Sequence, residues 1–153
     1  MRERINDKIE QIVAYLEDLS EMMEQISLDD YIKNVMLKAA CERFIERIVG
    51  ALVDLGSLVI RERKFEPPET ESQIFEILRK NNLISEDLCE SLNDAKRMRN
   101  VIAHQYAKID DNIVYEAVTE QLANDSQKFI ENIKNSLNEN RKVEDEEDLE
   151  ECN

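Results

Sequence analysis

The residues from Ile48 to Ile60, IVGALVDLGSLVI, constrain the fold more than any other part of this chain. Asp54 is the only charged residue among them, so a helix built from this run is apolar nearly all round. A helix with one solvent-facing side carries polar residues along that side. We therefore expect this helix, from about Asp29 to Lys64, to lie in the middle of a bundle, to be covered by a second subunit, or both.

Helix breakers are nearly absent from the chain. Its 153 residues include two glycines and two prolines, and Trp is missing. The apolar residues are mostly Leu, Ile, Val, Ala and Met, a composition that favours an all-α protein. The length is that of one domain with a sizeable core.

The N-terminal segment has the clearest helical periodicity. Its apolar residues recur in alternating steps of four and three, the heptad spacing of one long helix. They are Ile5, Ile9, Ile12, Leu16, Leu19, Met23 and Ile26. Ser27 to Asp30 then supply capping side chains for the central helix.

The remaining chain is predicted to form three more helices. Glu66-Pro67-Pro68 ends the central helix, because proline disfavours a helical residue before it. A short helix from about Ser72 to Lys80 and a long one from about Glu86 to Ala107 follow. Asp110-Asp111 cap a last helix. Residues 1–137 should therefore form an up-and-down bundle of four long helices plus one short helix.

The last segment, residues 138–153, is polar and acidic, and we expect a disordered tail there. Glu144 to Glu151 alone hold seven acids, and without them the formal charge of −15 becomes −8. A chain this acidic repels nucleic acid at long range, which argues against a general DNA-binding role.

Cellular location is predicted from what the sequence contains. Cys41, Cys89 and Cys152 are far apart and match no metal spacing, which indicates reduced thiols in a cytosol. The charged start, MRERINDKIEQ, has no apolar signal core, and no run approaches 18 apolar residues. We expect a cytoplasmic protein that does not enter a membrane.

The helix from Glu86 to Ala107 holds the only histidine, His104. One seam of this helix contains Arg99 and Tyr106 where the pattern asks for apolar residues. Arg97, Asn100 and His104, together with Asn93, form a neighbouring polar stripe. These positions can be purely structural, with Arg99 paired to a carboxylate and His104 favoured by the helix C-terminus. Asp54, Glu42 and Glu46 are the carboxylates that the central helix offers to Arg99.

The same residues suit phosphate chemistry. Histidine can take a proton from a 2′-hydroxyl or give one to a leaving oxygen. Arginine offers a fixed fork of donors to phosphate oxygens. Together they suit metal-independent RNA cleavage. One histidine can hardly be base and acid in the same step, whereas two copies related by a two-fold axis could share those roles.

The octet from Arg99 to Tyr106, RNVIAHQY, resembles the R-N-x-x-x-H-x-Y signature of the HepT-like branch of the HEPN superfamily. The central ERFIERIVGALVDLGSLVI is similar to that family's long second helix, and YAKIDDNIVYEAV to its loop and last-helix start. The resemblance spans roughly Met1 to Leu137. It implies a five-helix bundle that forms a homodimer, with the Arg and His of both subunits in a shared cleft.

The resemblance also implies a function. Many members are endoribonuclease toxins paired with a small nucleotidyltransferase antitoxin, which adds AMP to the motif tyrosine. Arg99 would then bind the scissile phosphate, His104 would be the acid/base, Asn100 would orient that pair, and Tyr106 would be the modification target. We add Asp54 as a carboxylate that could anchor Arg99. No cofactor or metal is expected.

Two features of the sequence stand against a simple catalytic site. On a straight helix Arg99 and His104 diverge by about 140°, so they would meet around a substrate, across the dimer or through a distorted helix. The acidic surface disfavours unspecific RNA binding, although a basic rim is a candidate. That rim would consist of Arg61, Arg63, Lys64, Lys96 and Arg97.

Two alternatives to a nuclease stay open at this point. One is a non-catalytic module that binds a nucleotide or docks a nucleotidyltransferase, with Arg99 contributing binding alone. The other is a purely structural helical dimer, which would tolerate substitution of Arg99 and His104.

Overall fold

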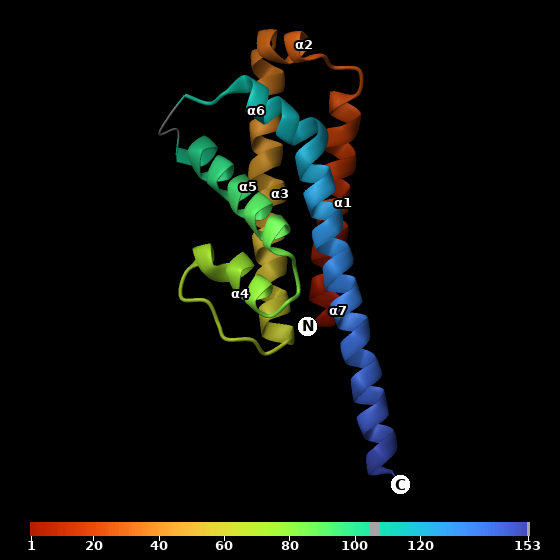
Figure 1. Cartoon of the computed structure of the whole chain (residues 1–153). Helices are drawn as coiled ribbons and strands as arrows, with labels where there is room; N and C mark the ends of the chain where they lie inside the picture. Colours follow the sequence, from red (N-terminus) through yellow and green to blue (C-terminus); the bar gives the residue numbers. More distant parts are fainter. Residues whose placement is uncertain (105–107, 153) are drawn as a thin grey trace.

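The computed structural model describes residues 1–104 and 108–152, and these are folded as helices and short connections, which confirms the all-α prediction (Figure 1). The long helices are α1 (Arg2–Met23), α3 (Val35–Glu62), α5 (Glu86–His104) and α7 (Leu122–Glu151). The shorter elements are α2 (Leu28–Lys33), the 3₁₀ turn η1 (Glu71–Gln73), α4 (Ile74–Lys80), α6 (Asp111–Glu116) and the π-helical turn η2 (Ala117–Gln121).

Helix α3 lies in the middle of the bundle, as its composition predicted. The other elements pack around it, α1 on one side and α4 and α5 on the other, while α7 runs alongside α1 (Figure 1). Its buried residues include Ile45, Ile48, Leu52, Leu55 and Val59, each 0–1% exposed. Gly56 lets α4 come close, because a Cβ at this position would lie 2.7 Å from Cγ2 of Ile74.

The segment predicted as one helix from Asp29 to Lys64 is divided at Asn34. This residue has an extended backbone, with φ −110° and ψ 99°, and its side chain accepts a hydrogen bond from the amide of Leu37. Asparagine favours this capping conformation over the helix interior. The short helix α2 before it begins with a reciprocal capping box between Ser27 and Asp30. The structure therefore contains two helices, α2 and α3, where the sequence pattern predicted one.

The last long rod is formed by α6, η2 and α7 together (Figure 1). Buried residues recur every four positions at Val114, Val118, Leu122 and Ser126. In a regular α-helix each step of four drifts by about 40° around the axis. The π-helical turn forms its hydrogen bonds over five residues where an α-helix uses four, and this wider turn keeps the run facing the core.

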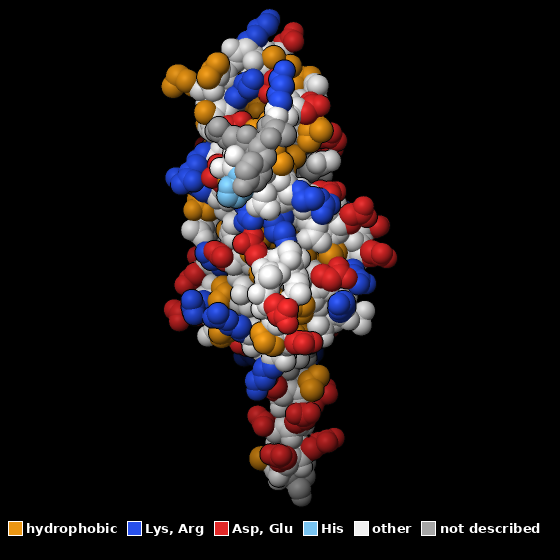
Figure 2. Space-filling model, turned by 90° about the vertical axis from the view of Figure 1, so that its left-hand side faces the viewer, with side chains coloured by type: hydrophobic (Ala, Val, Ile, Leu, Met, Phe, Trp, Pro, Cys, Tyr) orange, Lys and Arg blue, Asp and Glu red, His pale blue; other side chains and the backbone are white. Residues whose placement is uncertain are grey.

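Helix α7 continues to Glu151, so the acidic segment is helical in the structure where a disordered tail was expected. No glycine or proline follows residue 68, and Glu, Lys and Arg are good helix formers, so nothing local ends the helix. Leu137 is the last buried residue of α7. Acidic side chains cover the projecting end (Figure 2). Within the described ranges, no helix is long and apolar enough to cross a membrane.

The two glycines of α3 provide a matched test of this packing. We expect Gly56→Ala to lower the free energy of unfolding by about 1–3 kcal/mol, because the new methyl group overpacks against buried Ile74. Gly50→Ala meets nothing within 4 Å, and it should raise stability by about 0.5–1 kcal/mol through helix propensity. Urea unfolding followed by circular dichroism measures both. Equal effects of the two substitutions would contradict the close α3–α4 contact.

Candidate functional site

Helix α5 carries three of the candidate residues, Arg99, Asn100 and His104, on its last two turns. It begins after Ser85, whose hydroxyl accepts a hydrogen bond from the amide of Leu88 at 3.1 Å. It then continues as an α-helix to His104. Because it does so without interruption, Arg99 and His104 leave it about 140° apart. A distortion of the helix therefore does not bring these two side chains together within one chain.

The side chain of Arg99 is mostly covered, with 18% of it exposed. Its Nε and Nη2 donate to Oδ1 of Asn100 at 3.3 and 3.0 Å. Nη2 also forms a close ion pair with the carboxylate of Glu71 in η1. The structure thus brings Arg99 and Asn100 into contact, and it holds the guanidinium from two sides.

Asp54 does not pair with Arg99, contrary to our expectation. Its carboxylate is 63% exposed and lies 3.4 Å from Nζ of Lys8 on α1. The carboxylate that anchors Arg99 is Glu71, a partner that no pattern in the sequence indicated. No spacing rule distinguishes Glu71 from Glu66 and Glu69 in the same acidic connection. A contact across 28 residues depends on how α4 and η1 fold back onto α5.

Lys96, one turn before Arg99 on α5, binds the same segment of the chain that carries Glu71. Only 7% of this residue is exposed. Its ammonium donates to the carbonyl oxygen of Glu71 at 3.2 Å and lies 5.7 Å from the centre of the Phe75 ring. Burial lowers the pKa of Lys96, an effect that the negative charge of Glu71 opposes. Glu71 is therefore held at both its backbone and its side chain.

The predicted basic rim does not form as a continuous surface. Lys96 is buried, and Arg97 is paired with Asp94 on its own helix. Arg63 donates to Ser136 and stacks on the Phe65 ring at 5.3 Å. Lys96, Arg97 and Arg63 therefore bind groups of the protein itself.

Arg99 forms part of the wall of a groove between α1, α3 and α5, with a volume of about 340 Å³. Asp54 lies in the same groove, so the structure places it near Arg99 without pairing them. The lining residues are Lys8, Gln11, Tyr15, Arg43, Glu46, Arg47, Gly50, Ala51, Asp54, Arg99 and Ala103. We call this the Arg99 groove.

A larger cavity of about 690 Å³ lies on another side of α5. Met98, Ile109, Ile113 and Leu122 are among its lining residues, and neither Arg99 nor Asn100 is. Its mainly apolar wall does not suit a phosphate group. Of the candidate residues, Arg99 and Asp54 line the Arg99 groove, whereas Asn100 and His104 line neither space.

His104 is the exposed last residue of α5. Tyr106 lies outside the described residues, so its predicted role as a modification target stays a prediction. Asn100 is exposed beside Arg99. The catalytic role of His104 likewise stays a prediction.

The burial of Lys96 has a consequence for stability. Below its lowered pKa, folding must bury a charged ammonium, and this cost disappears as pH rises toward the usual 10.5. Between the lowered pKa of Lys96 in the folded protein and its usual value of 10.5, the unfolded chain binds more protons than the folded one. We therefore expect the stability of the wild type, relative to Lys96→Met, to increase as pH approaches 10.5. Urea unfolding of both proteins at a series of pH values measures this difference, and a difference that stays flat would contradict it.

Comparison with known proteins identifies relatives along most of the chain. The family model described as "Ribonuclease HepT-like" matches residues 12–133. The tRNA nuclease HepT of Aphanizomenon flos-aquae is 29% identical over 115 residues, which are 75% of this chain and 78% of that protein. The mRNA nuclease HepT of Shewanella oneidensis is 25% identical over 132 residues, which are 85% of this chain and 98% of that protein.

A solved structure shares the fold. It is the tri-AMPylated HEPN toxin of Shewanella oneidensis in complex with the MNT antitoxin. It superimposes with a TM-score of 0.81 at 25% sequence identity, covering 88% of this chain and 98% of that one. The helical arrangement, the relatives and the family model agree, and this chain belongs to the HepT-like ribonuclease family.

Proposed function

We propose that this protein is a metal-independent endoribonuclease that acts as the toxin of a toxin–antitoxin pair. The observation that carries the proposal is the R-N-x-x-x-H-x-Y octet, whose residues Arg99 to His104 end α5, in a chain whose relatives are named as tRNA and mRNA nucleases. The contact between Arg99 and Asn100 supports it, since it presents the guanidinium at the wall of a groove.

Arg99 and His104 have separate roles in the proposed reaction. Arg99 binds the scissile phosphate and stabilises the charge that grows on its oxygens. The ribose 2′ oxygen attacks phosphorus as a His104 side chain takes its proton, and the bond to the 5′ oxygen breaks as that oxygen gains a proton. The 140° divergence within one helix supports a homodimer, in which two copies of His104 serve as base and acid across a shared cleft.

Glu71 adds a step to substrate binding. Its carboxylate is bound to the guanidinium of Arg99, the same group that would bind the phosphate. A phosphate that binds Arg99 through Nη2 therefore competes with Glu71. Because the Glu71 side chain is 49% exposed, it can turn toward solvent while Lys96 retains its backbone carbonyl.

The proposed partner is a nucleotidyltransferase antitoxin that adds AMP to Tyr106. The support is the similar Shewanella oneidensis toxin, which is AMPylated and in complex with the MNT antitoxin. An AMP group two residues after His104 adds bulk and negative charge beside the proposed site. It would repel RNA and so inactivate the toxin.

The nuclease is tested by His104→Ala. This exposed residue at the end of α5 should be dispensable for folding, whereas loss of the acid/base should reduce RNA cleavage by about 10²–10⁴-fold. Gel analysis of labelled RNA, with EDTA present, measures the rate, and light scattering verifies the dimer. Cleavage that survives in the variant, or that stops in the wild type on adding EDTA, contradicts the proposal. A non-catalytic binding module would show no hydrolysis by the wild type.

The modification site is tested with the cognate transferase and ATP. We expect one or more added AMP masses on the peptide containing Tyr106 and a parallel loss of RNA cleavage. Tyr106→Phe should accept no AMP and should remain active in the presence of the transferase. Intact-protein and peptide mass spectrometry measure the label. AMP on another residue of wild-type protein would refute the assignment.

A further inference from the structure

The Arg99 groove is cationic in a strongly acidic chain. Lys8, Arg43, Arg47 and Arg99 line it together with two acids, Glu46 and Asp54, whereas the whole chain carries −15. Clefts with an excess of one charge concentrate the field and attract the opposite charge. The groove is therefore a place on this molecule where a polyanion can bind against the overall repulsion.

Arg47 differs from the other three cations in its partners. Lys8 pairs with Asp54 at 3.4 Å, Arg43 pairs with Glu46 at 3.4 Å, and Arg99 pairs with Glu71. Within residues 1–104 and 108–152, Arg47 has no such ion pair, and its side chain is exposed. A guanidinium with five donors is thus available to a ligand in the groove.

The α1 wall adds a neutral donor. Lys8 donates to Oε1 of Gln11 at 2.9 Å, and Nε2 of Gln11 donates to the hydroxyl of Tyr15 at 3.1 Å. Because that hydroxyl accepts from Gln11, its own proton can be given to an oxygen of a ligand. On the α3 wall, Gly50 lies one turn beyond Arg47, and a Cβ there would meet nothing within 4 Å. The groove is open at this point.

We propose that the Arg99 groove binds the phosphodiester backbone of single-stranded RNA next to the scissile phosphate, and that Arg47 binds this flanking phosphate. Arg47 and Arg99 come from different helices and line the same groove, so one strand can contact both. The Tyr15 hydroxyl donates to the same backbone. This inference rests on the proposed nuclease function, which it extends from the cleaved bond to the neighbouring nucleotide.

The test measures binding separately from cleavage. The probe is a fluorescent single-stranded RNA with 2′-O-methyl riboses, which lacks the attacking hydroxyl. Anisotropy gives its affinity at several salt concentrations for the dimeric full-length protein. For a single strand, the logarithm of the association constant falls linearly with the logarithm of the salt concentration, and loss of one phosphate contact should make this slope shallower by about 0.7. Arg47→Ala should show this change together with weaker binding.

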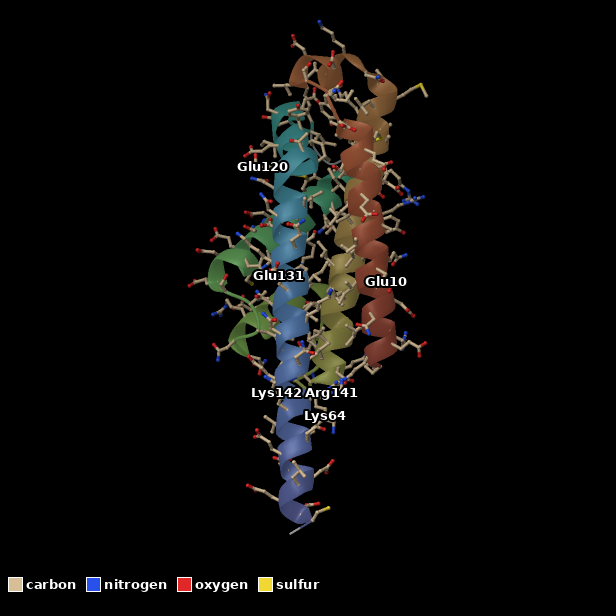
Figure 3. The ribbon with its side chains drawn as sticks, turned by 90° about the vertical axis from the view of Figure 1, so that its right-hand side faces the viewer. Glu10, Lys64, Glu120, Glu131, Arg141 and Lys142 are labelled. Carbon is tan, nitrogen blue, oxygen red and sulfur yellow. The ribbon has the colours of Figure 1, made fainter. Side chains whose placement is uncertain are left out.

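Two further variants make the result specific. Arg141→Ala removes the same charge from α7, outside the groove (Figure 3), and it should leave affinity and slope unchanged. Arg47→Lys keeps the charge and should retain the slope, although it loses the planar fork. Urea unfolding of each variant verifies the fold. Equal behaviour of Arg47→Ala and Arg141→Ala, or no binding of the probe by the wild type, would overturn the assignment.

Cleavage of unmodified RNA distinguishes failure of this inference from failure of the proposed function. If the wild type cleaves RNA and Arg47→Ala has the same KM and kcat, the flanking site is wrong and the nuclease stands. If Arg47→Ala changes the salt dependence of probe binding but the wild type cleaves no RNA, the phosphate-binding role of Arg47 is supported and the proposed nuclease function is wrong.

Discussion

The need to cover α3 organises the whole molecule. A helix that is apolar on most of its circumference must be shielded from water, and α1, α4 and α5 provide that cover. One strip of α3 remains partly open, from Arg43 through Arg47 and Gly50 to Asp54. The helices on either side of this strip turn it into the Arg99 groove. The groove and the buried core are therefore two results of one packing arrangement.

Arg99 is held by contacts that differ in how readily they break. Asn100 is its neighbour on the same helix, so that contact does not depend on another segment folding back onto α5. Glu71 comes from a separate connection, and its side chain is half exposed. Buried Lys96 secures the backbone of that connection. The guanidinium is thus ordered in the free protein, yet one of its two partners can yield to an incoming anion without unfolding η1.

Much of this arrangement could be predicted from the sequence, and the misses have physical reasons. The apolar run at Ile48–Ile60 predicted the central helix. The site predicted from the octet stays a prediction, although Arg99 and Asn100 are in contact and Asp54 pairs with Lys8 instead of Arg99. The break at Asn34 was missed because one capping side chain outweighed a continuous apolar pattern. Glu71 and Lys96 were missed as a pair because helical periodicity carries no information about where a loop returns. Tyr106 and the dimer stay predictions.

The helical course of the acidic segment has an electrostatic consequence. Seven acids between Glu144 and Glu151 lie on a rod that projects past the end of the bundle (Figure 1), while the cationic groove lies along its side. The negative charge of the molecule is therefore unevenly distributed, with its highest density at the projecting end of α7. At physiological salt the field of this charge reaches about 8 Å from the surface, so it acts in the last step of an encounter. We expect a polyanion to be repelled more strongly at the acidic end than beside the groove.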